Sequence, residues 1–212
     1  MHPLLLATAL AAAPPAALRP PVATVAPAAA TAPVSRAAFH DAMRRLWEDH
    51  ITWTRLYIVS AAAGLPDVDQ AAQRLLRNQA DIGDAIKPFY GDAAGDRLTA
   101  LLRGHILTAA QLVGAAKSGD TAAVRGLSAQ WYANGDSIAT FLGAANPRHW
   151  PAATLESAMR MHLDLTLKEA VARLHGDWAG DIAAYDEVHR HILQMADVLS
   201  DGIVRQFPSR FN

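Results

Sequence analysis

The sequence predicts an all-α fold, a six-helix bundle built from three repeated antiparallel hairpins and preceded by an unpacked N-terminal segment. The first observation is a repeated spacing: His50, His105 and His162 each stand 14 residues before a glycine (64 − 50, 119 − 105 and 176 − 162). An aspartate follows each glycine within three residues, which is typical of a repeated helix–turn–helix unit. The second observation is that no segment alternates apolar and polar residues with a period of two, so strands are not expected.

Apolar residues recur at three- and four-residue spacing in six segments, which indicates helices with one buried face. In the first hairpin, a stripe over residues 37–62 runs through His50, and Gly64 supplies the C-terminal cap. The second helix, 67–88, is expected to stop near Pro88, because proline interrupts the hydrogen-bond ladder of a helix. Such short turns make neighbouring helices antiparallel. The remaining helices are expected at residues 94–117, 120–143, 152–174 and 178–206.

The composition is that of a folded, nearly neutral protein. Of the 212 residues, 51% are hydrophobic and 18% are charged, and the formal net charge is −1. This balance, without any run of Lys or Arg, gives no indication of a nucleic-acid partner. The absence of cysteine excludes disulfides, thiolate metal sites and a cysteine nucleophile. No window after residue 36 contains the roughly 18 consecutive apolar residues that a membrane-spanning helix needs.

Residues 1–36 differ in composition from the rest of the chain. They contain no Asp, Glu or Lys and only two Arg. The apolar run over residues 4–13 has the length of the hydrophobic region of a signal peptide, and Ala9-Leu10-Ala11 fits the cleavage pattern. The Pro/Ala-rich stretch that follows is typical of an extended linker. We therefore expect export to the periplasm, with a disordered tail on a cytoplasmic protein as the alternative, and a single helical domain over residues 37–212.

The candidate site lies on the inner faces of the helices. On a helical wheel, His50, His105 and His162 each lie within roughly 40° of the centre of their apolar stripe. A threonine follows each histidine by three or four residues, and its hydroxyl is expected to bond the buried imidazole. These threonines are Thr54, Thr108 and Thr166, and the other polar residues expected near the site are Tyr57, Asn78, Asn134, Glu169 and Arg173.

Three interpretations of this pattern stay open. If the three histidines converge, their imidazoles suit a transition metal ion, or two of them a haem iron. A larger cavity would suit an organic ligand, or an enzyme in which Glu169 or a histidine is the general base. Alternatively, each histidine is a core residue, Glu169 pairs with Arg173 one turn away, and the protein is a structural or partner-binding module.

A further histidine pair, His189 and His191, is less suited to metal binding. Two residues apart on a regular helix, the two rings diverge by about 200° and cannot bind one ion together. Only a crude surface site with His175 is conceivable. The sequence also lacks the H-E-x-x-H, di-iron E-x-x-H, P-loop and G-x-S-x-G motifs.

Several segments resemble known proteins: LWEDHITWTRLYIVSAAAGLPD, RLLRNQADIGDAIKPFYG, WYANGDSIATFL, KEAVARL and GIVRQFPSRF. On these segments, which lie within about residues 44–211, the chain resembles a family of small bacterial all-helical proteins whose members carry the labels glycosyltransferase or acetylglutamate kinase. Both activities normally require α/β folds with nucleotide-binding elements, and the sequence has no strand signals. The resemblance therefore implies the helical fold and assigns no catalytic residue.

Overall fold

The structure is a computed structural model and describes residues 33–212. The predicted all-α fold is confirmed, and each helix boundary lies within two residues of the expected one. One small difference is that Pro88 lies inside the last turn of its helix, which continues to Tyr90. The predicted signal peptide lies outside the described residues. The helices are α1 (Arg36–Ala63), α2 (Val68–Tyr90), α3 (Asp92–Ser118), α4 (Thr121–Ala145), α5 (Ala152–Leu174) and α6 (Trp178–Gln206), followed by the 3-10 turn η1 (Pro208–Arg210).

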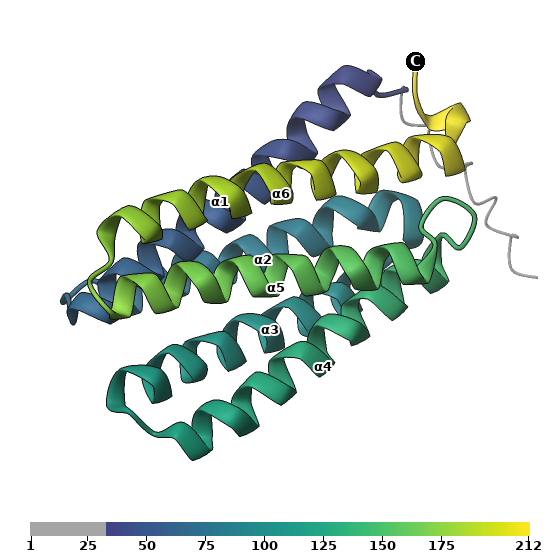
Figure 1. Cartoon of the computed structure of the whole chain (residues 1–212). Coiled ribbons are helices and arrows are strands. Elements are labelled where there is room, and N and C mark those ends of the chain that lie inside the picture. Colours follow the sequence, from purple (N-terminus) through teal and green to yellow (C-terminus); the bar gives the residue numbers. More distant parts are fainter. Residues whose placement is uncertain (1–32) are drawn as a thin grey trace, which may run out of the picture. The chain divides into compact units, whose positions relative to one another are not determined.

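The three predicted glycine turns close the three hairpins in the same way. Gly64, Gly119 and Gly176 have φ values of 67°, 76° and 74°, in the left-handed region that glycine adopts without strain. In each turn the residue after the glycine donates its N–H to a carbonyl five residues earlier, which satisfies the end of the helix. Figure 1 shows these turns together at one end of the bundle.

The six helices pack in chain order, and α6 returns against α1, so they enclose one interior (Figure 1). The closest helix approach is between α2 and α3, where a Cβ built on Gly83 would lie 2.6 Å from the Gly95 carbonyl oxygen. Glycine at both positions therefore allows the two backbones to touch. The helix α1 also contacts α3 and α5, so the first helices of the three hairpins share the interior.

The start and end of the described chain are joined at the opposite end of the bundle. Val34 donates its N–H to the Arg210 carbonyl at 3.0 Å and accepts one from Asn212 at 3.1 Å. Beneath this pairing, Phe89 stacks on Phe211 with ring centroids 5.5 Å apart. The C-terminal residues therefore fix the beginning of α1.

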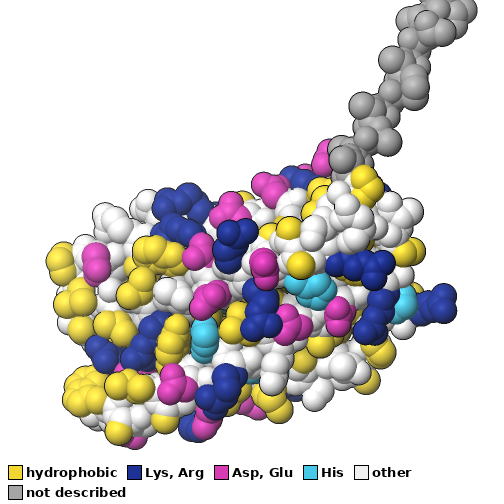
Figure 2. All heavy atoms as spheres, turned by 90° about the horizontal axis from the view of Figure 1, so that it is seen from above, with side chains coloured by type: hydrophobic (Ala, Val, Ile, Leu, Met, Phe, Trp, Pro, Cys, Tyr) yellow, Lys and Arg dark blue, Asp and Glu magenta, His cyan; other side chains and the backbone are white. Residues whose placement is uncertain are grey.

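The surface carries charges of both signs. Figure 2 shows basic and acidic side chains interspersed on one face, with hydrophobic side chains gathered toward the end that holds the glycine turns. Leu65, Trp178 and Ile182, all near these turns, are more than a third exposed. Among residues 33–212, no helix is long and apolar enough to cross a membrane.

Candidate functional site

The three repeat histidines meet in the interior of the bundle. The imidazole centroid of His162 lies 5.8 Å from that of His50 and 6.4 Å from that of His105. The three side chains are only 3–4% exposed, and all three line one cavity of about 30 Å³. The structure thus brings together residues 112 positions apart in the chain (162 − 50), as a shared axis of the three hairpins requires.

For Thr54 and Thr166, the predicted bonds to the imidazoles are wrong. Thr54 and Thr166 donate their hydroxyls to the backbone carbonyls of His50 and His162, each at 2.8 Å. A threonine at i+4 lies closer to the carbonyl one turn back than to a side chain directed inward, so the backbone bond forms. Thr108 is half-buried. The threonines therefore do not determine which imidazole nitrogen carries the proton.

In the first two hairpins, amide side chains from the second helix contact the histidines instead. Asn134 donates from Nδ2 to the Leu101 carbonyl at 3.1 Å, so its Oδ1 is free to accept the Nδ1–H of His105 at 2.9 Å. The lone pair of His105 is therefore on Nε2. In the first hairpin, Gln79 Nε2 lies 3.3 Å from Nδ1 of His50.

Asn78 is placed like Asn134 but in the first hairpin. It is completely buried and donates to the Leu46 carbonyl at 2.9 Å. The third hairpin differs, because Nδ1 of His162 is buried without a hydrogen-bond partner among the described residues. A buried polar atom without a partner is unusual in a folded protein, which makes His162 the exceptional member of the set.

The three histidines are neutral in the folded protein. Burial lowers the pKa of His50 to about 3, and the electrostatic effect of the nearby His105 adds to the shift. Burial also lowers the pKa of His105 to about 4. Burial and the neighbouring histidines hold the pKa of His162 well below its ordinary value. Neutral imidazoles are the form that binds metal ions.

The side chains around the histidines are mostly apolar and include aromatic rings and methionine thioethers. Trp47 and Trp131 pack on His50 and His105, with ring centroids 5.8 Å and 5.0 Å apart. Three of the five methionines of the chain line the same cavity. The methionines are Met43, Met159 and Met195. As the side chains stand, no set of three or more His, Asp or Glu residues within 33–212 forms a metal site.

Glu169 belongs to a separate buried ion cluster rather than to the histidine cavity. Its Oε1 lies 3.0 Å from Arg55 Nη1, and Arg55 also donates from Nη2 to Asp181 at 2.8 Å. Arg173 pairs with Asp181 at 3.2 Å, so the expected alternative of a Glu169–Arg173 pair is wrong. Arg173 reaches Asp181 because α6 packs beside α5 and brings this carboxylate between the two arginines.

The protonation of this cluster follows from burial and from its arginines. Burial raises the pKa of Glu169 to about 7, although Arg55 opposes the shift. Burial would also raise the pKa of Asp181, but hydrogen bonds from Arg55 and Arg173 hold it below its ordinary value. Both carboxylates are 0% exposed, so neither is open to a substrate.

Tyr57 lines another cavity, of about 100 Å³, toward the end of the bundle that holds the glycine turns. Thr54 and Thr166 line it as well, and most of its other walls are aliphatic. Both threonine hydroxyls already bond backbone carbonyls. Tyr57 is half-buried, and burial raises the pKa of its phenol. The cavity therefore offers little polar chemistry.

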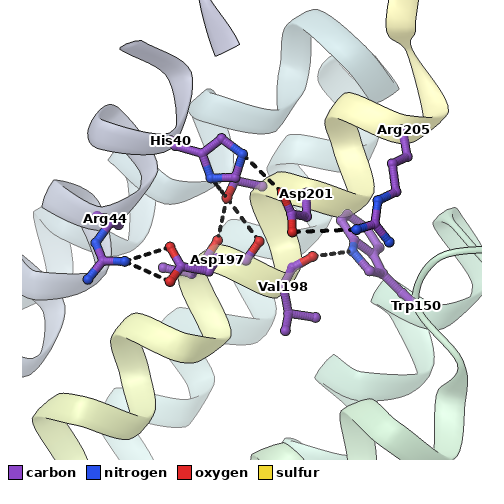
Figure 3. Close-up of polar contacts among 9 residues, drawn as sticks. His40, Arg44, Trp150, Asp197, Val198, Asp201 and Arg205 are labelled. Atoms are coloured by element: carbon purple, nitrogen blue, oxygen red, sulfur yellow. Dashed lines mark hydrogen bonds and ion pairs between the residues drawn. The ribbon is translucent and has the colours of Figure 1, made fainter. Parts of the chain in front are cut away.

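A serine, a histidine and an aspartate meet between α1 and α6. Ser200 Oγ lies 2.8 Å from His40 Nδ1, and His40 Nε2 lies 3.1 Å from Asp201 (Figure 3). However, Ser200 is 0% exposed and donates to the Ala196 carbonyl within its own helix. Figure 3 shows Arg44 on Asp197 beside this trio. We interpret these contacts as a structural connection between two helices.

Sequence reasoning did not single out Arg55, Gln79 or Asp181, and it considered His191 only as one of a diverging histidine pair. His191 lies 29 residues after His162 (191 − 162), just as Asn134 lies 29 residues after His105 (134 − 105). That spacing is a signal that could have found it. Arg55 and Asp181 pair across 126 residues, and no local pattern indicates such a contact.

Comparisons of the chain with protein-family models, curated proteins and solved structures find no match.

Proposed function

We propose that the bundle binds one transition metal ion between His50, His105 and His162. The observation that carries the proposal is the convergence of three neutral imidazoles, one from each hairpin, on one small cavity. Metal sites in helical bundles are commonly built in the core from side chains of facing helices. Asn134 holds Nδ1 of His105 and leaves Nε2 for a ligand, which is how metal-binding histidines are usually oriented.

The distances require a small adjustment on binding. Metal–nitrogen bonds of about 2.0–2.1 Å place the centroids of two bound imidazoles roughly 5–6 Å apart. The observed separations of His162 from His50 and from His105, 5.8 Å and 6.4 Å, are at or just above this range. Binding therefore requires the side chains to rotate and move inward. The cavity of about 30 Å³ suits an ion and is far smaller than a porphyrin, so we favour an ion over haem.

The identity of the ion follows from the other side chains of the cavity. Thioethers and imidazoles without carboxylates are typical ligands of copper(I), and Met43, Met159 and Met195 supply the thioethers. A single positive charge also costs less to bury than a double charge in such an apolar interior. We therefore propose copper(I) as the preferred ion.

Anaerobic titration with copper(I), in competition with bicinchoninate, tests the proposal. We expect one ion per chain, and at least a hundredfold weaker binding in His105→Gln. The matched control is His189→Gln, since this histidine is on the surface beside Glu48 and its replacement should leave affinity unchanged. Circular dichroism verifies that both variants fold. Absence of uptake, or equal affinity in wild type and His105→Gln, would refute the proposal.

Export is a second part of the proposal. A periplasmic location suits a protein that binds a soft metal ion, and residues 1–36 have the composition of a signal peptide with a linker. Mass spectrometry of the protein from the periplasmic fraction should show a chain that begins after Ala11. Full-length protein confined to the cytoplasm would refute export and leave the metal site as a separate question.

A further inference from the structure

His191 occupies the same place in the third hairpin as Asn78 and Asn134 in the first two. Each of the three side chains donates a hydrogen bond to a backbone carbonyl of the preceding helix, at 2.9, 3.1 and 2.9 Å. In every case that carbonyl belongs to the residue four positions before the repeat histidine. The acceptors are Leu46, Leu101 and Ala158.

The replacement of asparagine by histidine removes a hydrogen bond. The amide of Asn134 both donates to a carbonyl and accepts from the Nδ1 of its histidine. His191 donates from Nε2 to Ala158, and Nδ1 of His162 has no partner among the described residues. The rings of His162 and His191 lie nearly parallel, with centroids 6.4 Å apart. His191 therefore leaves unmade the bond that Asn134 makes to the histidine of its own hairpin.

His191 also lies between the histidine cavity and the surface. It is half-buried and lines a pocket of about 180 Å³ between α5 and α6. Leu155, Met195 and Leu199 line both this pocket and the histidine cavity, so a single layer of side chains separates them. Because Nε2 of His191 carries the proton donated to Ala158, its Nδ1 has a free lone pair.

We propose that this pocket is the entrance for the metal ion and that His191 is the first residue to bind it. The inference rests on the proposed function. The ion exchanges part of its earlier ligand shell for Nδ1 of His191 and then moves to His162. An imidazole in a half-solvated pocket lowers the barrier to this ligand exchange without holding the ion permanently. Such a residue changes the rates of uptake and release equally and leaves the equilibrium affinity unchanged.

The variant His191→Asn tests this inference, because the other two hairpins already carry asparagine at this position. In anaerobic stopped-flow transfer of copper(I) from its bicinchoninate complex, we expect uptake and release to slow at least tenfold. The dissociation constant should stay within about threefold of wild type. A second variant, Val198→Trp, fills the pocket without touching an imidazole and should slow uptake as well. Its control is Met161→Trp, at an exposed position of α5 outside the pocket.

The outcomes separate the two proposals. If the wild-type chain takes up no copper(I), the metal site and its entrance both fail. If wild type binds copper(I) but both variants exchange it at the wild-type rate, only the entrance is refuted. If His191→Asn weakens equilibrium binding as strongly as His105→Gln, His191 is a permanent ligand and the proposed role is wrong.

Discussion

Asn134 positions His105 through two hydrogen bonds made by one amide. Its Oδ1 lies 2.9 Å from His105 Nδ1, and its Nδ2 donates to the Leu101 carbonyl at 3.1 Å. The amide thus connects the two helices of the hairpin and determines the imidazole tautomer. This contact links the stability of the bundle to the chemistry of its interior.

We expect Asn134→Ala to lower the free energy of unfolding by about 1–3 kcal/mol, because it leaves the buried imidazole N–H of His105 without a partner. Urea denaturation followed by circular dichroism measures the change. Ser137→Ala on the same helix is the control, since this exposed hydroxyl bonds only its own helix at Ala133. A loss equal to that of the control would show that water replaces the amide without cost.

The features predicted from the sequence are those that depend on residues close to one another in the chain. The 14-residue spacing from His50 to Gly64, and its two copies, predicted the glycine turns, and the position of the histidines within their apolar stripes predicted their inward direction. Turn geometry and helix faces depend on local chemistry, which explains this success. The Thr54 prediction failed because the helix offers its own carbonyl as an acceptor. The contact of Arg55 with Asp181 depends on how α1 meets α6, which no local pattern contains.

The buried histidines should make the bundle acid-sensitive. Their ordinary pKa is 6.5, whereas the folded pKa of His105 is about 4. Below pH 6.5 the unfolded chain therefore binds protons that the folded chain does not, so stability falls as pH falls. His105 alone contributes a slope of about 1.4 kcal/mol per pH unit between these two values. Glu169, with a pKa raised to about 7, opposes this trend, because the folded chain binds its proton more tightly.

A single variant isolates the contribution of one histidine to that pH dependence. Between pH 6 and pH 5, the free energy of unfolding of His105→Gln should fall less steeply than that of wild type, by about 1.4 kcal/mol per pH unit. Urea titrations at several pH values measure both slopes. Identical slopes would mean that the folded chain protonates His105 between pH 6 and pH 5 as readily as the unfolded chain does. That result would also count against its role as a metal ligand.

Replacement of one arginine of the buried ion cluster should strongly destabilise the protein. Arg55→Met leaves Glu169 without its arginine partner and Asp181 with only Arg173, so we expect a loss of about 3–5 kcal/mol in the free energy of unfolding. The matched control is Arg160→Met, which breaks the exposed pair with Asp136 and should cost at most about 1 kcal/mol.

Neutralising Glu169 tests the cause of that loss. In the background of Arg55→Met, the added change Glu169→Gln should restore a large part of the stability, because it removes the carboxylate that lost its arginine partner, whereas Asp181 keeps Arg173. If the double variant is no more stable than Arg55→Met alone, the arginine contributes through packing on Tyr185, 5.4 Å from its guanidinium, rather than through charge.

Because α2 and α3 approach each other closely at Gly83, alanine should destabilise the protein there but stabilise it at the open position Gly114. A Cβ at Gly83 would clash with the Thr99 hydroxyl and lie 2.6 Å from the Gly95 carbonyl, whereas a Cβ at Gly114 meets nothing within 4 Å. Gly83→Ala should therefore destabilise the bundle by about 1–3 kcal/mol, since it forces two packed helices apart. Gly114→Ala should stabilise it by up to about 1 kcal/mol through helix propensity. Thermal unfolding of both variants checks the contrast. Equal stabilisation by both would show that the two helices separate freely, and the packing around the nearby histidine cavity would then be looser than the crossing implies.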